Sequence, residues 1–243
     1  MNKYLFLCTL CCFIMSVLSD LKTILEHELC SRKDNKCFTD FTRAMFDTLV
    51  KGDKEVGIES IEPSFVERID GNMPVVKYVL RNSTLRGFDS CQFRKATLLE
   101  EEQRLKLDIL CNKFHMCGLY EVNGTLIIVP VSGDGDYCIQ AKKYKILVDT
   151  KISTYEGDDG KDYVKFDNYK YQAELQGGLD FNLTNLFRGN KDLSDPFLRF
   201  ARGHWKMVAR QIQDPPISTF LNLMIDNFNA LMKHVPLDSM VKD

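Results

Sequence analysis

Apolar side chains recur at intervals of three or four residues near the C-terminus, over residues 194–235. This spacing predicts a long amphipathic helix. Asp195 followed by Pro196 is typical of a helix start, because a capping side chain then precedes a proline in the first turn. Pro215 and Pro216 predict a kink that divides the helix into two halves. The apolar positions are Phe197, Ala201, Trp205, Val208, Ile212, Phe220, Met224, Phe228 and Leu231.

Before this helix, the pattern changes to alternation. Val76, Tyr78 and Leu80 fall on one face of an extended segment, and residues 105–109, 144–148 and 163–167 alternate in the same way. Alternation predicts strands with one buried face. Residues 126–131 are continuously apolar, which is typical of a strand covered on both faces. Turn signals predict an antiparallel meander, and they lie at 71–72, 123–124, 133–136 and 157–160.

Helical patterns also occur near the N-terminus, at residues 20–29 and 39–51, and Gly52 is typical of the end of the second helix. The apolar stripe of the C-terminal helix needs a partner, and the strands provide it. We therefore predict an α+β fold in which a strongly curved antiparallel sheet wraps the long C-terminal helix and encloses an apolar interior.

Residues 1–19 have the features of a secretory signal peptide. Lys3 precedes an apolar run over 5–18, and small residues at 17–19 form a cleavage site. The run is shorter than the roughly 20 residues that span a bilayer, which disfavours a membrane anchor. We expect residues 20–243 to form a soluble, secreted protein with no transmembrane segment. Their length permits one domain or two, and we predict one.

Charge adds little to this picture. Lys and Arg number 32 and Asp and Glu number 34, which gives a net charge of −2 at pH 7. The two signs are interspersed, so the sequence does not indicate nucleic acid or an anionic membrane as a partner.

Cysteines and sequons support an extracellular location. Removal of the signal peptide leaves an even number of cysteines, which argues for disulfides in an oxidising compartment. Cys30 and Cys37 flank a short polar loop and predict a local disulfide. The pairing of the other four, Cys91, Cys111, Cys117 and Cys138, stays open. Asn82, Asn123 and Asn182 begin glycosylation sequons and are predicted to lie on the surface.

Motifs for metal binding and catalysis are weak. Cys111, His115 and Cys117 offer zinc ligands, but a fourth ligand at regular spacing is missing, so disulfides are preferred. Asp134 and Asp136 lack the spacing of a calcium loop and fit a hairpin turn better. The chain has no Gly-x-Ser-x-Gly motif, no His-Glu-x-x-His motif and no phosphate-binding loop. We predict no metal, no cofactor and no enzymatic activity, with a secreted hydrolase as a minor alternative.

Several segments, in order along nearly the whole mature chain, resemble the insect Takeout / haemolymph juvenile-hormone-binding protein family. The resemblance starts at Cys30 and Cys37 and ends with Trp205 and residues 235–236. Between them, the matching segments are 57–63, 82–87, 118–126, 129–135 and 186–195. The chain departs from the family in having more cysteines than the usual Takeout pattern.

The resemblance implies a carrier with a tunnel for a small lipophilic ligand, such as a juvenile-hormone-like terpenoid or a fatty-acyl lipid. By pattern alone, the helical stripe would be read as ordinary core; the resemblance favours ligand binding. Family members serve hormone transport, feeding, circadian output and chemosensation. We expect a monomer in haemolymph, and the alternative is a secreted interaction protein with a filled core that binds a receptor or another haemolymph protein. The candidate ligand-binding residues are Trp205, Val208, Ile212, Phe220, Met224 and Phe228 from the helix, with Ile109, Ile128 and Phe166 from the sheet.

Overall fold

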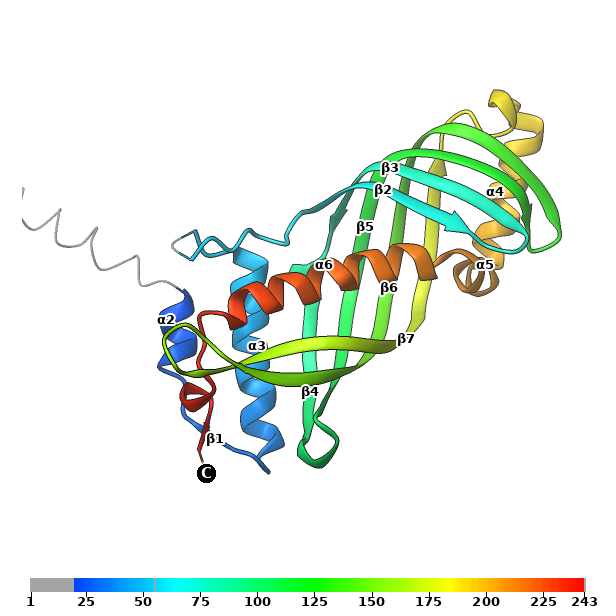
Figure 1. Ribbon diagram of the computed structural model, residues 1–243. Helices are drawn as coiled ribbons and strands as arrows, with labels where there is room; N and C mark the ends of the chain where they lie inside the picture. The colour runs from blue at the N-terminus through cyan, green and yellow to red at the C-terminus, as the bar shows by residue number, and fades with distance from the viewer. Residues whose placement is uncertain (1–19, 55, 243) are drawn as a thin grey trace, which may run out of the picture.

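The computed structural model describes residues 20–54 and 56–242, so the predicted signal peptide lies outside the described residues. Helices α2 and α3 come first, long strands follow, and helices α4, α5 and α6 come near the C-terminus (Figure 1). This order confirms the α+β class. The principal bounds are α2 Asp20–Leu25, α3 Asn35–Lys51, β2 Ser64–Asn72, β3 Val76–Arg86, β4 Cys91–Leu99, β5 Arg104–Leu126, β6 Val129–Glu156, β7 Asp162–Leu183, α4 Lys191–Gly203, α5 Trp205–Ile212 and α6 Asp214–Met232.

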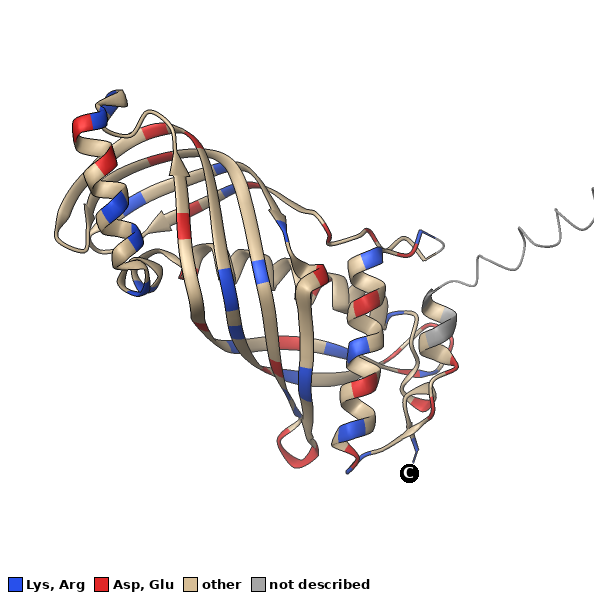
Figure 2. Ribbon diagram, turned by 180° about the vertical axis from the view of Figure 1, so that it is seen from behind, with Lys and Arg blue, Asp and Glu red and all other residues tan. Residues whose placement is uncertain are grey.

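Helix α3 begins at Asn35, four residues before the predicted start at 39, and ends at Lys51 as predicted. The Asp34 carboxylate accepts hydrogen bonds from the N–H groups of Lys36 and Cys37, both at 3.0 Å, and so caps the helix. Gly52 ends it with a φ of 78°, which confirms the predicted stop. Helix α3 packs on β4, and acidic and basic residues recur along its length (Figure 2).

The long strands form an antiparallel sheet. In the described part of the chain, its strand order is β2-β3-β5-β6-β7. Strands β4 and β3 pair in turn with β5, β4 with its first half and β3 with its second half. Strands β5 and β6 contain 23 and 28 residues and run along most of the molecule (Figure 1). The predicted alternation is confirmed, since Leu105 and Leu107 are buried and Lys106 is exposed.

The strong curl that we predicted for this sheet is not observed. The two edge strands, β2 and β7, do not pair with each other among the described residues, so the sheet stays open. Strong curvature needs bulges or glycine kinks repeated across neighbouring strands. The register shifts here are few for strands of this length, and they fall between Arg81 and Thr84, Phe93 and Lys95, Lys142 and Tyr144, and Thr150 and Ile152.

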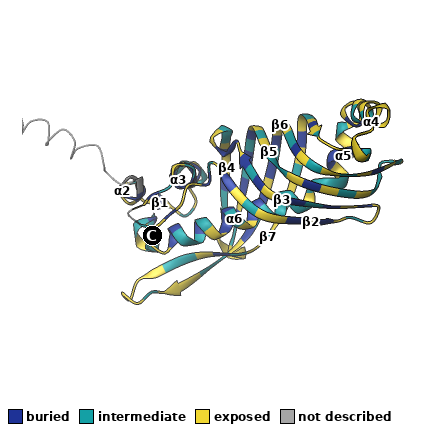
Figure 3. Ribbon diagram, turned by 90° about the horizontal axis from the view of Figure 1, so that it is seen from above, coloured by how far each residue is buried: buried dark blue, intermediate teal, exposed yellow. Residues whose placement is uncertain are grey.

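Helix α6 lies against the buried face of the sheet and contacts both edge strands (Figure 3). Asn229 fixes it to β7 by two hydrogen bonds. Its side-chain oxygen accepts from the N–H of Phe166 at 2.8 Å, and its amide nitrogen donates to the carbonyl of Phe166 at 2.9 Å. A side-chain amide therefore satisfies backbone groups that an edge strand would otherwise leave unpaired.

The C-terminal helical region differs from the prediction at both ends of its first half. It begins at Lys191, because the Asn190 side chain caps the helix through the N–H of Asp192, and Pro196 lies inside α4. It then breaks at His204, which follows the weak helix former Gly203. Because of this break and the next one, α4, α5 and α6 point in different directions (Figure 1).

The predicted kink at Pro215 and Pro216 is a new helix start. Helix α5 ends at Ile212, and the two prolines occupy the first turn of α6. Proline fits this position because N–H groups in a first turn have no helical acceptor. Helix α6 alone forms the long straight element, at 19 residues and therefore about 28 Å.

Two predicted turns are in fact strand interior. Gly124 lies in β5 and Gly133 in β6. A Cβ at Gly124 would lie 2.5 Å from the carbonyl oxygen of Val75, and one at Gly133 would lie 2.9 Å from the Cα of Leu186. These glycines therefore allow close approach of neighbouring segments, and residues 133–136 do not form the hairpin turn that we expected. The predicted turn at 157–160 does join β6 to β7.

The β5–β6 turn falls instead in the apolar run at 126–131. Leu126 pairs with Val129, so Ile127 and Ile128 form the turn. Ile127 has a φ of 61°, and its N–H donates to Oε1 of Gln211 on α5 at 2.7 Å. Ile128 is 79% exposed. Our predictions that this run is covered on both faces and that Ile128 lines the interior are wrong.

Disulfides in the described residues join Cys30 to Cys37, Cys91 to Cys111 and Cys117 to Cys138. The first closes the polar loop before α3. The second joins β4 to β5 and the third joins β5 to β6, in each case between directly paired residues. The pairing that the sequence left open is therefore set by strand register.

Candidate ligand-binding cavities

A cavity of about 210 Å³ lies between the sheet and the helices α4, α5 and α6. We call it the tyrosine cavity, because Tyr78, Tyr120, Tyr137 and Tyr144 line it. Aliphatic and aromatic side chains make up nearly all of the rest. A water molecule needs roughly 10–15 Å³ on this scale, so the interior is not filled by the protein's own side chains.

The hydroxyl groups of these tyrosines are all bonded to the protein. Tyr120 donates to the carbonyl of Thr184 at 2.7 Å, and Tyr137 donates to the Ser83 hydroxyl at 2.8 Å. Burial raises the pKa of Tyr120 and of Tyr137 to about 12. The phenols are therefore neutral and satisfied, and they present mainly their ring carbons to the cavity.

The break between α5 and α6 places two polar groups at the cavity wall. Pro216 has no N–H, so the carbonyl of Ile212 lacks its helical donor. The hydroxyl of Tyr78 donates to that carbonyl at 2.5 Å. The hydroxyl of Tyr144 donates to Oε1 of Gln213 at 3.1 Å. Burial raises the pKa of both tyrosines well above the usual range.

A second cavity, of about 390 Å³, lies at the other end of α6. We call it the α3 cavity, because α3 lines it with Phe38, Phe41, Thr42 and Met45. Phe166 of β7 and Phe228 of α6 belong to its apolar part, with their rings 5.8 Å apart. Its rim is polar and includes Arg32, Glu100, Gln103, Ser153 and Thr154.

Between the cavities, a set of buried apolar residues lines neither. Along β5, β6 and α6, side chains that line the α3 cavity give way to side chains that line the tyrosine cavity, and buried residues separate them on each element. On β5 these are Ile109 and Cys111, and Cys111 is held in the disulfide with Cys91. We call the other three residues the septum. They are Ile109, Val148 and Met224, each at most 3% exposed and all part of one core cluster.

The predicted lining residues are divided among these places. Val208, Ile212 and Phe220 line the tyrosine cavity, whereas Phe166 and Phe228 line the α3 cavity. The structure thus brings them to two separate cavities, where the sequence implied one tunnel. Ile109 and Met224 lie in the septum.

Trp205 is not among the residues that line either cavity, so its assignment as a lining residue stays a prediction. The helix restarts at this position, and the stripe that appeared continuous in sequence changes direction there. The Trp205 ring is partly buried, and the Lys206 ammonium lies 5.4 Å from its centroid.

Sequence reasoning missed the tyrosines and Gln213. Tyr78 and Tyr144 stand at inward positions of alternating strands, and a tyrosine at such positions indicates a polar partner inside. That signal was present but was read only as strand periodicity. Gln213 carried no signal, because its role follows from the helix break.

The cysteines considered as zinc ligands all form disulfides. His115 and His27 each lie near a cysteine pair, but Cys117 is bonded to Cys138 and Cys30 to Cys37. A disulfide sulfur is not a thiolate ligand.

The asparagines of the sequons, Asn82, Asn123 and Asn182, are exposed. Within the described residues, no helix is long and apolar enough to cross a membrane.

Comparisons with known proteins agree with this architecture. The haemolymph juvenile hormone binding protein family matches residues 6–242. The circadian clock-controlled protein daywake of Drosophila melanogaster is 25% identical over 196 residues, covering 76% of this chain and 75% of the relative. The daywake protein of Drosophila yakuba is 24% identical over 233 residues, covering 88% and 86%.

Among solved structures, the crystal structure of Takeout 1 from Epiphyas postvittana superposes with a TM-score of 0.83 at 23% identity. The match covers 89% of this chain and 100% of that one, which shows a shared fold. The family is described as one of binding proteins. Because the family model matches nearly its whole length, the chain belongs to the haemolymph juvenile hormone binding protein family.

Proposed function

We propose that the mature chain is a secreted, monomeric carrier that binds a small hydrophobic ligand, a juvenile-hormone-like terpenoid or a fatty-acyl lipid, in its interior. The observation that carries the proposal is the tyrosine cavity, which is walled by apolar side chains and has its phenol groups already bonded to the protein. A space of this chemistry suits an oily molecule better than water.

The driving force would be transfer of apolar surface out of water. Burial of about 300 Å² of ligand surface contributes roughly 7 kcal/mol at about 25 cal/mol per Å². The entropy lost on association reduces this figure. Because micromolar affinity requires about 8 kcal/mol, burial of this area alone gives binding weaker than micromolar. Val208, Ile212 and Phe220 supply part of the contact surface.

An extracellular location is part of the proposal. Its supports are the disulfides of the described residues, the haemolymph family and the pattern of residues 1–19. We further propose N-glycosylation at Asn82, Asn123 and Asn182, whose exposure leaves room for a glycan. Secretion from insect cells followed by glycosidase treatment and mass measurement tests both points.

Ligand titration tests the carrier function directly. The secreted protein, delipidated, is titrated with a fluorescent fatty acid and with a juvenile-hormone analogue. Saturable binding with a defined stoichiometry is expected. Absence of saturable binding across a broad lipid panel would contradict the proposal.

Native mass spectrometry of protein that has not been delipidated separates a carrier from an interaction protein. A carrier retains co-purified lipid, and extraction followed by mass measurement identifies it. A protein that acts only through its surface has no reason to retain one. Repeated recovery of lipid-free protein from lipid-rich medium would favour the interaction protein.

A further inference from the structure

The α3 cavity has a chemical gradient that the tyrosine cavity lacks. Most of its interior side chains are apolar, such as Phe228 and Met232, each 2% exposed, and the buried polar ones are the uncharged Thr42 and Thr150. Of its lining residues, Arg32 and Glu100 are the charged ones, and both lie at the rim. Such a gradient fits an amphiphile with its tail inside and its headgroup at the rim.

Arg32 already holds a carboxylate. Its Nη1 donates to Oε1 of Glu100 at 2.9 Å, and the two side chains are 38% and 52% exposed. Among the described residues, the guanidinium of Arg32 makes no other hydrogen bond in the structure. Since a guanidinium carries five N–H donors, Arg32 has donors left for a second carboxylate.

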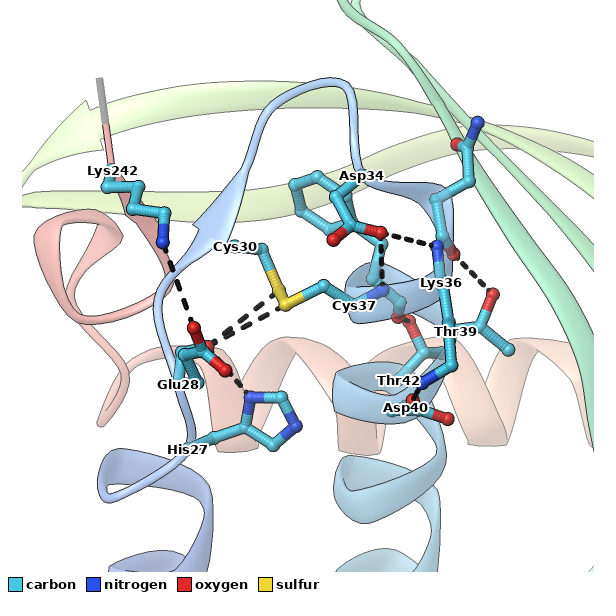
Figure 4. Close-up of a disulfide and its surroundings, with 12 residues drawn as sticks. His27, Glu28, Cys30, Asp34, Lys36, Cys37, Thr39, Asp40, Thr42 and Lys242 are labelled. Atoms are coloured by element: carbon cyan, nitrogen blue, oxygen red, sulfur yellow. Dashed lines mark hydrogen bonds and ion pairs between the residues drawn. A yellow bond between two sulfur atoms is a disulfide. The ribbon is translucent and has the colours of Figure 1, made fainter.

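The loop that carries Arg32 is held in place from several sides. The Cys30–Cys37 disulfide closes it, and the Asp34 carboxylate ties it to the first turn of α3 (Figure 4). Strand β1 (Cys30–Ser31) pairs with β8 (Val241–Lys242), and the N–H of Cys30 donates to the carbonyl of Met240 at 2.8 Å. Met240 and Val241 line the same cavity. A fixed loop reduces the entropy cost of presenting Arg32 to a ligand.

We propose that the α3 cavity is a binding site for a long-chain carboxylic acid, with Arg32 as the partner of its carboxylate and the apolar interior as the site of its tail. Glu100 competes for the same guanidinium. The exposed Arg32–Glu100 pair is weak enough to yield, and the bidentate fork of arginine matches a carboxylate. This proposal rests on the carrier function proposed above, and it adds a headgroup preference to one of the cavities.

The test compares cis-parinaric acid with its methyl ester, which has the same tail and no charge. Each is titrated against the delipidated wild type, Arg32→Gln and Glu100→Gln. Lys33→Gln is the matched control, because it removes the same charge from the same loop at an exposed residue that lines neither cavity. We expect Arg32→Gln to weaken acid binding about fivefold, as for a partly exposed ion pair, and to leave ester binding unchanged. Lys33→Gln should leave both unchanged.

Glu100→Gln separates a headgroup site from a structural latch. Loss of a competitor should strengthen acid binding, by about twofold as for a weak exposed pair. Loss of a latch would instead shift binding in the same direction as Arg32→Gln, for acid and ester alike, and would overturn the proposal. Equal affinity for acid and ester in the wild type, with no effect of Arg32→Gln, would also overturn it while leaving the carrier function intact. Binding of neither probe would contradict both.

Discussion

The two ends of the interior are built from the same long strands and the same helix, yet they offer different chemistry. In the tyrosine cavity, the polar groups are phenols whose hydroxyls are bonded to the protein. In the α3 cavity, no tyrosine is present among the described lining residues, and the charged groups, Arg32 and Glu100, lie at the rim. The comparison shows that the elements closing each end, rather than the shared sheet, set what each cavity can bind.

Those closing elements differ in how the sequence forms them. Helices α4 and α5 close the tyrosine cavity, and the proline-induced break before α6 supplies its polar groups. Helix α3 and a disulfide-closed loop close the α3 cavity. One end is thus an apolar chamber, and the other is a chamber with a charged rim.

The largest expected effect comes from removing the wall between the cavities. Met224→Ala deletes a side chain that is 3% exposed. Large-to-small substitutions at such sites cost about 2–5 kcal/mol, which urea denaturation followed by circular dichroism measures. The variant should also bind longer acyl chains than the wild type, because the two chambers join.

Met207→Ala is the matched control, since Met207 lies on α5 and is 44% exposed. It should change stability by less than about 0.5 kcal/mol and leave chain-length preference unchanged. Competition with a series of saturated acids of increasing length measures that preference. Destabilisation of Met224→Ala without any change in preferred length would show that the septum does not limit the ligand.

Much of this fold could be predicted from the sequence, because the periodicity of apolar residues indicates which side chains are buried. The alternation at 105–109 and the stop at Gly52 have the roles that the pattern predicted. Strand lengths were underestimated, since Gly124 and Gly133 signal turns locally but serve close packing in the folded chain. The family resemblance placed the interior between sheet and helix, which periodicity alone could not distinguish from a solid core.

The division of the interior into two cavities could not be predicted from the sequence. It depends on where three separate elements place Ile109, Val148 and Met224 relative to one another, and no local pattern encodes that. The helix break before Trp205 was not predicted either, because a helical stripe remains continuous in sequence even where the helix itself breaks. Tertiary contacts at Pro216 and Tyr78 determine what the break exposes.

Filling the tyrosine cavity should separate the two chambers functionally. Ala141 lines this cavity and is 6% exposed. Ala141→Phe would displace about 100 Å² of ligand contact, a loss of about 2.5 kcal/mol, or roughly 70-fold in affinity. Titration with a juvenile-hormone analogue measures the loss.

Gln140→Phe adds the same ring on the opposite, exposed face of β6 and serves as the control. Its affinity for the analogue should equal that of the wild type. Equal affinities for both variants and the wild type would place the analogue outside the tyrosine cavity.

A smaller effect is expected at the α5–α6 break. Tyr78→Phe leaves the carbonyl of Ile212 without its donor, and an unsatisfied buried acceptor costs about 1–3 kcal/mol. Tyr171→Phe removes a weaker, exposed bond of 3.3 Å to the carbonyl of Asp214 and should cost about 0.5 kcal/mol or less. Thermal or urea unfolding compares the two. Equal stability losses would mean that the hydroxyl of Tyr78 does not stabilise the break.

The last effect is absent at neutral pH and is seen only in alkali. Burial raises the pKa of Tyr120 and Tyr137 to about 12 in the folded chain, whereas an unfolded tyrosine titrates near ~10. Above pH ~10 the unfolded state therefore loses protons that the folded state retains, and stability falls as the pH rises towards ~12. Below pH ~9 these groups contribute no pH dependence.

Spectrophotometric titration at the phenolate band, run beside circular dichroism, should show ionisation of the buried phenols only together with unfolding. Tyr137→Phe should make the alkaline loss of stability shallower, because one raised pKa is removed. Ionisation of every tyrosine near pH ~10 with the fold intact would contradict the satisfied, dry character that distinguishes the tyrosine cavity from the α3 cavity.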